Sequence, residues 1–186
     1  VPSRMPRPAP KPAAPKPSPK ADARPPHVQS SASVGGRKKG QAPRPRDQAR
    51  TTVMMRNIPN NYTRDMLLEM LDAEGFLGQY DFVYLPIDFT SGAGLGYAFV
   101  NMVDASLVPQ FWEVFDGYCN WVLPTAKVCE LSWSKPYQGL RANVLRYKNS
   151  SVMHESVSDD NKPCVFVNGT RAPFPRPTRA LRPPTC

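Results

Sequence analysis

The stretch that most constrains this chain is Leu95–Met102, which reads Leu-Gly-Tyr-Ala-Phe-Val-Asn-Met. Successive side chains of a β-strand point to opposite faces of the sheet, so Tyr97 and Phe99 should share one face and Ala98 and Val100 the other. Small and branched side chains suit a face that packs against helices. The stretch therefore predicts a strand with one core face and an aromatic pair on the opposite face.

The same stretch agrees with the octamer of RNA-recognition domains: Lys/Arg, Gly, Phe/Tyr, Gly/Ala, Phe, Val, any residue, Phe/Tyr. Positions Gly96 to Val100 match in order, whereas Leu95 replaces the basic residue and Met102 replaces the last aromatic one. Aromatic rings on an open sheet face can stack on the bases of single-stranded RNA. Tyr97 and Phe99 are thus the first candidate RNA-binding residues.

Turn signals and side-chain periodicity predict the elements around this strand. Alternation predicts further strands at 53–58, 80–85 and 127–134, and helical spacing predicts helices at 63–75, 104–116 and 137–148. The order strand, helix, strand, strand, helix, strand, helix is a split βαβ arrangement. We therefore predict an α+β, ferredoxin-like fold: a four-stranded antiparallel sheet with two helices on one face, plus an added C-terminal helix.

The first predicted strand should lie beside the aromatic strand at the centre of the sheet. Met54 stands where the companion hexamer of this motif usually carries an aromatic residue, and a flexible, polarizable Met can still lie against a base. Arg56 shares its face and could reach a phosphate or a base edge. Asn57 could hydrogen-bond a base, or it could bond its own backbone as the chain enters a turn.

The remaining candidate RNA-binding residues are Tyr84, Ser132, Ser134, Lys135 and Arg141. Tyr84 should share a face with Tyr80 and Phe82, and this face either enlarges the aromatic platform or belongs to the core. The two serines take outward positions on the last strand. The two basic residues either supply positive charge to RNA or form a solvated basic face.

Composition divides the chain into three parts. Residues 1–50 contain 12 prolines and carry 12 Lys or Arg against two acidic residues, so we expect a disordered basic tail. Residues 51–155 should form the folded domain, although 51–150 carry a net charge of −3, which argues against strong phosphate-driven binding by the domain alone. Residues 156–186 should be mostly disordered, with a short strand indicated at Cys164–Val167 before an Asn-Gly turn.

The residue types argue against metal binding and catalysis. The four cysteines form no C-x-x-C pair, the chain has two histidines, and no paired carboxylates or nucleophile–base pair stand out. The turn at 57–61 lacks the glycines of the anion-cradling loop that acyl-phosphate hydrolases of this fold would need. We predict a non-enzymatic protein without cofactor or metal, with reduced thiols, in the nucleus and/or the cytoplasm.

No apolar run approaches the length of a membrane span, and no secretory signal pattern opens the chain. Because the first residue is Val rather than Met, we expect the chain to be a fragment of a longer protein.

Several separate blocks resemble the C-terminal RNA recognition motif (RRM) of Mei-two-like proteins. They are Thr51–Asn60, Tyr62-Thr63, Tyr80–Phe82, Tyr84–Phe89, Gly96–Asn101, Lys127–Leu131, Gln138-Gly139 and Asn149–Met153. An apolar residue at the position of Leu95 is common in this family. The resemblance covers about residues 51–155 and implies an RNA-binding regulator, from a family associated with meiosis in fungi and development in plants.

Two functions remain open. In the first, Tyr97 and Phe99 stack on single-stranded RNA, as in a post-transcriptional regulator, and the intact Gly-Tyr-Ala-Phe-Val run favours this function. In the second, a partner or the third helix, through Tyr137, Leu140 and Val144, covers the sheet of a protein-interaction module, and the acidic domain charge favours that function. Protein partners could also bind the Pro-rich tail.

Overall fold

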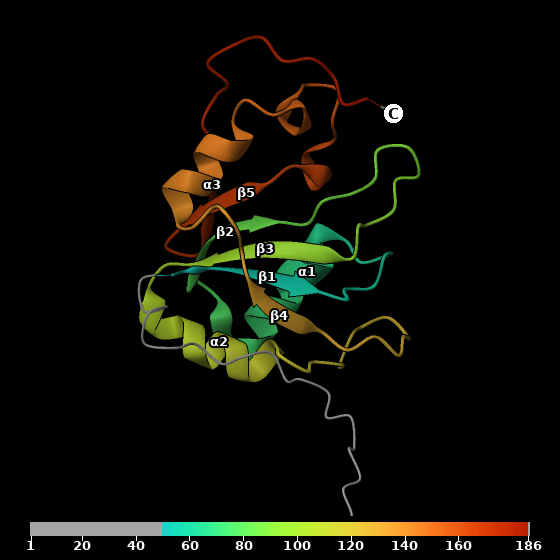
Figure 1. The fold of residues 1–186 in the computed structure, drawn as a ribbon, viewed down its shortest axis with the longest axis vertical. Helices are drawn as coiled ribbons and strands as arrows, with labels where there is room; N and C mark the ends of the chain where they lie inside the picture. The colour runs from blue at the N-terminus through green and yellow to red at the C-terminus, as the bar shows by residue number, and fades with distance from the viewer. Residues whose placement is uncertain (1–49, 186) are drawn as a thin grey trace, which may run out of the picture. The chain divides into compact units, whose positions relative to one another are not determined.

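Six strands form one antiparallel sheet in the computed structural model, which describes residues 50–185. The strands are β1 (Thr52–Arg56), β2 (Tyr80–Tyr84), β3 (Tyr97–Met102), β4 (Glu130–Trp133), β5 (Cys164–Val167) and β6 (Thr170–Ala172). Their order is β4-β1-β3-β2-β5-β6, and β1 and β3 lie side by side between β4 and β2 (Figure 1). The first four strands have the order of the predicted split βαβ fold, which is confirmed.

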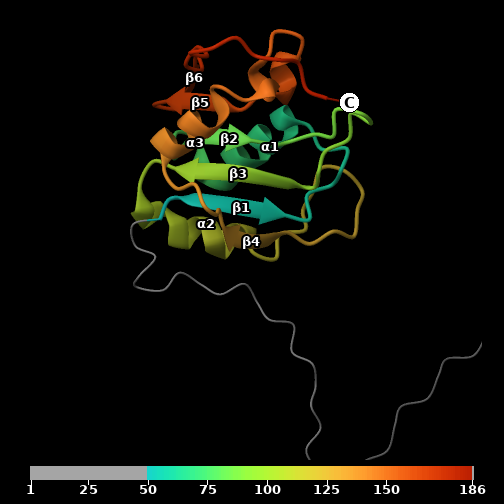
Figure 2. The same cartoon turned by 45° about the horizontal axis from the view of Figure 1, so that its top comes forward.

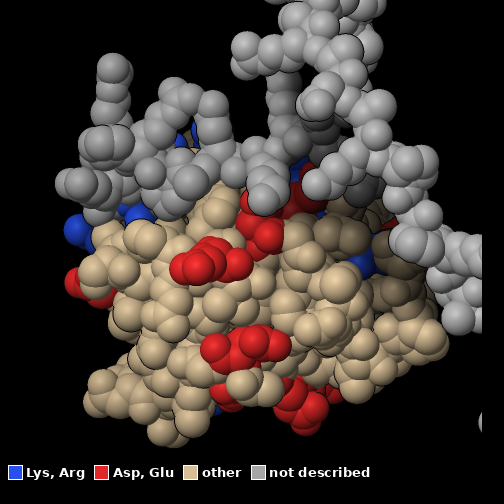
Figure 3. Space-filling view, turned by 90° about the horizontal axis from the view of Figure 1, so that it is seen from below, with Lys and Arg blue, Asp and Glu red and all other residues tan. Residues whose placement is uncertain are grey.

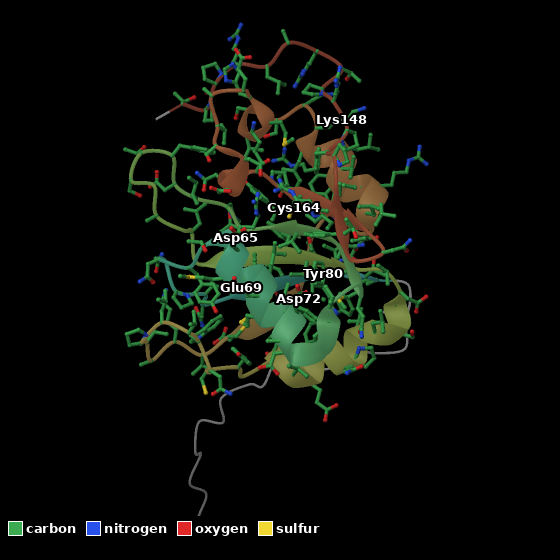
Figure 4. The ribbon with its side chains drawn as sticks, turned by 180° about the vertical axis from the view of Figure 1, so that it is seen from behind. Asp65, Glu69, Asp72, Tyr80, Lys148 and Cys164 are labelled. Atoms are coloured by element: carbon green, nitrogen blue, oxygen red, sulfur yellow. The ribbon has the colours of Figure 1, made fainter. Side chains whose placement is uncertain are left out.

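Two helices cover one face of this sheet and lie in front of it in Figure 4. α1 (Arg64–Leu71) continues into a π-helical turn, η2 (Asp72–Phe76), and α2 (Val108–Phe115) follows a 3-10 turn, η3 (Ala105–Leu107). Thr63 Oγ1 accepts a hydrogen bond from the Met66 N–H (3.2 Å), and the Asp104 carboxylate accepts one from the Ser106 N–H (2.7 Å). Both residues cap their helical segments.

The main core lies between the sheet and these two helices. Ala98 and Val100 of β3 are fully buried there, which confirms the predicted core face of that strand. The other large contributors are Val53, Met55, Leu67, Leu71, Phe76, Phe111 and Phe115. The aromatic face of β3 is consequently turned away from α1 and α2.

The third helix, α3 (Leu140–Tyr147), lies over the opposite face (Figure 2). Leu140, Val144 and Tyr147 pack there against a separate cluster of buried side chains. They come from β2, β5, the 3-10 turn η4 (Ser151–Met153) and the stretch between η4 and the next 3-10 turn, η5 (Asp159–Asn161). The buried members of this second cluster are Phe82, Tyr84, Val152, Val157 and Val165. The added helix is therefore present and covers part of the sheet.

The C-terminal segment, expected to be mostly disordered apart from a short strand, contains regular structure between residues 159 and 172. It supplies η5 and the β5–β6 hairpin, and β5 pairs with the edge of β2 through Val165–Phe82 and Cys164–Val83. Three consecutive apolar side chains, from Cys164 to Phe166, are buried by this pairing, so a short apolar run outweighs a composition typical of disorder. The predicted tail at 1–50 lies outside the described residues except for its last residue.

A bulge in β2 corrects the predicted faces of that strand. The register with β3 shifts between Tyr80 and Phe82. Tyr80 therefore belongs to the main core with Val83, whereas Phe82 and Tyr84 belong to the second cluster. An extra residue in one strand reverses the alternation on one side of the bulge, which simple period-two counting does not detect.

Candidate nucleic-acid interface

Three rows of side chains cross the sheet on the face opposite α1 and α2. Strand register places Glu130, Arg56 and Tyr97 in the first row, Ser132, Met54, Phe99 and Tyr84 in the second, and Thr52, Asn101 and Phe82 in the third. The first and second rows bring together six of the candidates from the sequence. These are Met54, Arg56, Tyr84, Tyr97, Phe99 and Ser132.

Tyr97 and Phe99 form the aromatic pair of this surface. Their ring centroids are 5.6 Å apart and the planes meet at 77°, so the two rings stand edge to face. Both side chains are half-buried, as is Met54 beside Phe99, while Arg56 beside Tyr97 is exposed. We name these four residues the open platform, since they offer apolar surface and one cation that α3 leaves accessible.

On the β2 side of the sheet, α3 covers the end of the second row. The Tyr147 ring stacks on Phe82 at 5.8 Å and 18°, and it meets Tyr84 edge to face at 4.7 Å. Tyr84 is only 7% exposed and offers little surface to RNA in this arrangement, so its role as an RNA contact stays a prediction. Phe99 touches the margin of this second cluster, whereas Tyr97 is not part of it.

Burial also controls the ionisation of these phenols. Burial, together with the nearby Tyr147 hydroxyl, raises the pKa of Tyr84 above its ordinary value. Burial raises the pKa of Tyr147 to about 12, although the charge of Arg146 opposes the shift. Both hydroxyls are therefore neutral at physiological pH and add no negative charge beside the platform.

The third row is closed by a hydrogen-bond network around the fully buried Thr52. Its hydroxyl donates to Asn101 Oδ1 (2.7 Å) and accepts from the Gly139 N–H (2.9 Å) and from Asn143 Nδ2 (3.0 Å). Gln138 Oε1 accepts from the Thr52 N–H (2.9 Å). This network attaches the start of α3 to the sheet, and sequence reasoning missed it, because its polar residues follow no periodic pattern.

Of the candidates on β4 and beyond, Ser134 and Ser132 are not freely accessible. Ser134 is 4% exposed, and its N–H donates to the Thr52 carbonyl (3.1 Å), so its role as an RNA contact stays a prediction. The Ser132 Oγ is shielded and has no hydrogen-bond partner among the described residues. It could bind a ligand only if a neighbouring side chain moved.

The last three candidates lie around the platform rather than on it. Asn57 is exposed in the turn after β1, with a left-handed φ of 58°, a conformation that Asn tolerates better than most residues. Lys135, shortly after β4, and Arg141, in the first turn of α3, are both exposed. The structure does not bring these residues into the rows of the sheet.

Charge is strongly divided between the sheet domain and the segments after it. Residues 51–134 contain three basic and ten acidic residues, whereas residues 135–150 contain four basic residues and no acidic one. Figure 3 views the molecule from the end at which α2 and β4 lie and shows Asp and Glu patches with few basic side chains. Three of these ten acidic residues, Asp65 and Glu69 of α1 and Asp72 of η2, are labelled in Figure 4.

Within residues 51–134, two of the three basic side chains are already engaged. Arg64 bonds to Asp159 and Asp160, and Lys127 Nζ donates to the Ile58 carbonyl (3.0 Å) and to Asn60 Oδ1 (2.6 Å). Arg56 thus remains as the cation that this part of the chain offers to a ligand.

No group of three or more His, Cys, Asp or Glu in the described part of the chain could hold a metal ion. None of the helices found in residues 50–185 is long and apolar enough to cross a membrane.

Residues 50–148 match the family described as RNA recognition motif 2. The chain is 39% identical over 137 residues to Protein MEI2-like 4 of Oryza sativa subsp. japonica, covering 71% of this chain and 13% of that protein. It is 40% identical over 129 residues to Protein MEI2-like 3 of Arabidopsis thaliana, covering 69% and 16%. The chain therefore spans only 13–16% of the length of these relatives.

A solved structure titled "Structure of Rna15 RRM with bound RNA (GU)" is 19% identical, with a TM-score of 0.37, and covers 51% of this chain and 94% of that one.

Proposed function

Because this chain belongs to the RNA recognition motif 2 family, a family of RNA-binding domains rather than enzymes, we propose that it binds single-stranded RNA on the open platform. The observation that most directly supports this proposal is the edge-to-face pair of Tyr97 and Phe99, which is half-exposed on the sheet face opposite α1 and α2. Rings in this position present surfaces on which bases stack. RNA binding of this kind suits a post-transcriptional regulator, which is the role that we propose for the protein.

Each member of the open platform has a distinct part in this proposal. The two rings take neighbouring bases, each stack being worth about 1–3 kcal/mol. Met54 lies beside Phe99 and offers a polarizable apolar surface to the same base. Arg56 lies beside Tyr97 and supplies a cation to a phosphate or a base edge.

The alternative function, a protein-interaction module with a covered sheet, is favoured by only part of the geometry. α3 buries Phe82 and Tyr84, but it does not enclose Tyr97 or Met54. The helix therefore shortens the surface available to RNA on the β2 side and leaves the β1 and β3 side open. This placement supports a compact site for about two stacked bases.

The test replaces both rings by leucine, in the full chain, as Tyr97→Leu/Phe99→Leu. Leucine keeps apolar volume next to the second cluster but lacks a ring face, so we expect affinity for mixed-sequence single-stranded RNA to fall about 30-fold or more. Fluorescence anisotropy measures the affinity, and urea unfolding verifies that the variant is folded. Val122→Leu, at an exposed loop position, is the control. A folded double variant that binds within twofold of the parent would refute stacking on the platform.

A further inference from the structure

Residues 51–134 contain few basic side chains, whereas several basic side chains surround a groove between α3 and the C-terminal segment. Two adjoining hollows, of about 510 and 420 Å³, share Asn149 and Arg179 in their walls. The first hollow is lined on the α3 side by Tyr137 and Arg146, and the second ends at Arg182. We name this surface the α3–tail groove.

The C-terminal wall of the groove is held in place by one asparagine. Asn149 Nδ2 donates to Thr178 Oγ1 (3.0 Å), and its Oδ1 accepts from the Thr178 N–H (2.9 Å). The Asn149 carbonyl also accepts from Arg179 Nη2 (3.3 Å). These bonds fix the segment around Thr178 to the end of α3, so the arginines of the segment are positioned rather than loosely tethered.

The groove carries only positive charge. Residues 135–150 contribute four basic residues and residues 173–185 contribute three, with no acidic residue in either segment. Arg146, Arg179 and Arg182 are exposed, and none of them forms an ion pair with a carboxylate within the described residues. This charge is left uncompensated beside a sheet domain of the opposite sign, so the groove is where a polyanion would be attracted.

An aromatic and guanidinium series joins the groove to the open platform. The Arg146 guanidinium lies 5.7 Å from the Tyr137 ring centroid and 5.4 Å from that of Tyr147. Tyr97 meets Phe99 edge to face, and Phe99 packs against the same second cluster as Tyr147. An RNA strand that leaves Tyr97 therefore meets the Arg146 guanidinium next, and then the Tyr137 ring, which is 39% exposed.

We infer that the α3–tail groove is a second RNA-binding site, which takes the phosphates of the strand as it leaves the open platform, through Arg146 and Arg179. The inference rests on the proposed function of the platform. A positive groove combined with exposed rings is the usual surface for the backbone of single-stranded nucleic acid, and an arginine beside a ring serves both phosphate and base. An acidic peptide would use the charge but would not require the platform next to it.

The experiment uses the full chain and two RNA lengths. A mixed-sequence tetranucleotide, followed by NMR titration, reaches only the platform, whereas a 12-nucleotide RNA, followed by anisotropy, can also enter the groove. For Arg146→Gln/Arg179→Gln we expect about a tenfold loss of affinity for the longer RNA and a salt dependence of log Kd that is less steep by about 1.4. Tetranucleotide binding should not change.

Lys162→Gln/Arg171→Gln is the matched control, because it removes two positive charges outside the groove. If both double variants lose the same affinity for the 12-nucleotide RNA, the groove is not an RNA-binding site. That result would not affect the proposal for the platform. Loss of tetranucleotide binding in Tyr97→Leu/Phe99→Leu supports the platform independently of that result. An acidic peptide, oligoglutamate, is the competitor: if it displaces the 12-nucleotide RNA at lower concentration than unlabelled RNA does, the groove is a peptide site and the inference fails.

Discussion

At the scale of single residues, Thr52 has more influence on the candidate interface than its position in β1 suggests. Its hydroxyl is bonded to Asn101 of β3 and to Gly139 and Asn143 at the start of α3. It therefore joins two central strands to the helix that limits the platform. Removing this hydroxyl leaves the Gly139 N–H without its partner and takes one hydrogen bond each from Asn101 Oδ1 and Asn143 Nδ2. An unsatisfied buried group costs about 1–3 kcal/mol.

We expect Thr52→Val, which keeps the side-chain shape, to lower the free energy of unfolding by about 2–4 kcal/mol in a urea titration. Thr51→Val is the matched control, because Thr51 Oγ1 makes a single part-buried bond to Asn101 Oδ1 (2.8 Å). That change should cost about 0.5–1.5 kcal/mol. Equal losses in the two variants would show that the network around Thr52 does not stabilise the attachment of α3.

At the scale of elements, one buried arginine anchors η5, just before the C-terminal hairpin, to the start of α1. Arg64 is 6% exposed, and its Nη atoms donate to the Asp159 carbonyl and lie 3.3–3.4 Å from carboxylate oxygens of Asp159 and Asp160. Burial on its own would raise the pKa of Asp159. The hydrogen bond from Arg171 and the positive charges of Arg171 and Arg64 outweigh burial, so the pKa of Asp159 is lowered. The carboxylate is therefore charged at neutral pH, and the anchor is complete.

Thiol reactivity measures whether this anchor holds the hairpin. Cys164 in β5 is buried, and burial raises its pKa to about 11, so it should react slowly with an alkylating reagent. In a Cys186→Ser background, we expect Arg64→Met to increase the alkylation rate of Cys164 about tenfold or more. The rate at Cys129, buried in the main core, should not change.

The control for this prediction is Arg171→Met. Arg171 contacts the same Asp159 (2.7 Å), but its side chain is 41% exposed, and exposed ion pairs contribute little to stability. We expect less than about a twofold change in Cys164 reactivity. If Arg64→Met also leaves Cys164 protected, the β5–β6 pairing holds the hairpin without the arginine.

At the scale of the whole molecule, the folded unit extends past the four-stranded domain that the sequence predicts. The apolar residues of β5 complete both clusters, since Phe166 packs in the main core against Tyr80 and Val165 packs in the second cluster. The edge of β2 is covered as a result, and an uncovered strand edge tends to pair with other chains.

We expect a chain that ends at residue 155 to lose on the order of 3–5 kcal/mol of unfolding free energy, because the burial of Val165 and Phe166 is lost. It should also associate in a concentration-dependent way, as size-exclusion chromatography would detect. A chain that ends at residue 175 retains the hairpin and should unfold like the parent. Similar stability of the two truncated chains would contradict the role given to β5.

The sequence by itself determined the fold class and the core face of β3, and it pointed to the four platform residues. These features depend on short-range periodicity and on a motif contained within one strand, so they can be read from neighbouring residues. The prediction of a short strand at Cys164–Val167 depended on a local apolar run in the same way.

Only the tertiary structure decided how much of the sheet stays open. The bulge that separates Tyr80 from Phe82 exists only in the register with β3, and the stacking of Tyr147 on Phe82 depends on where α3 lies. The bonds that place the helix and the hairpin join residues 86 and 95 positions apart in the chain. Contacts at such separations depend on the assembled fold, and no local pattern encodes them.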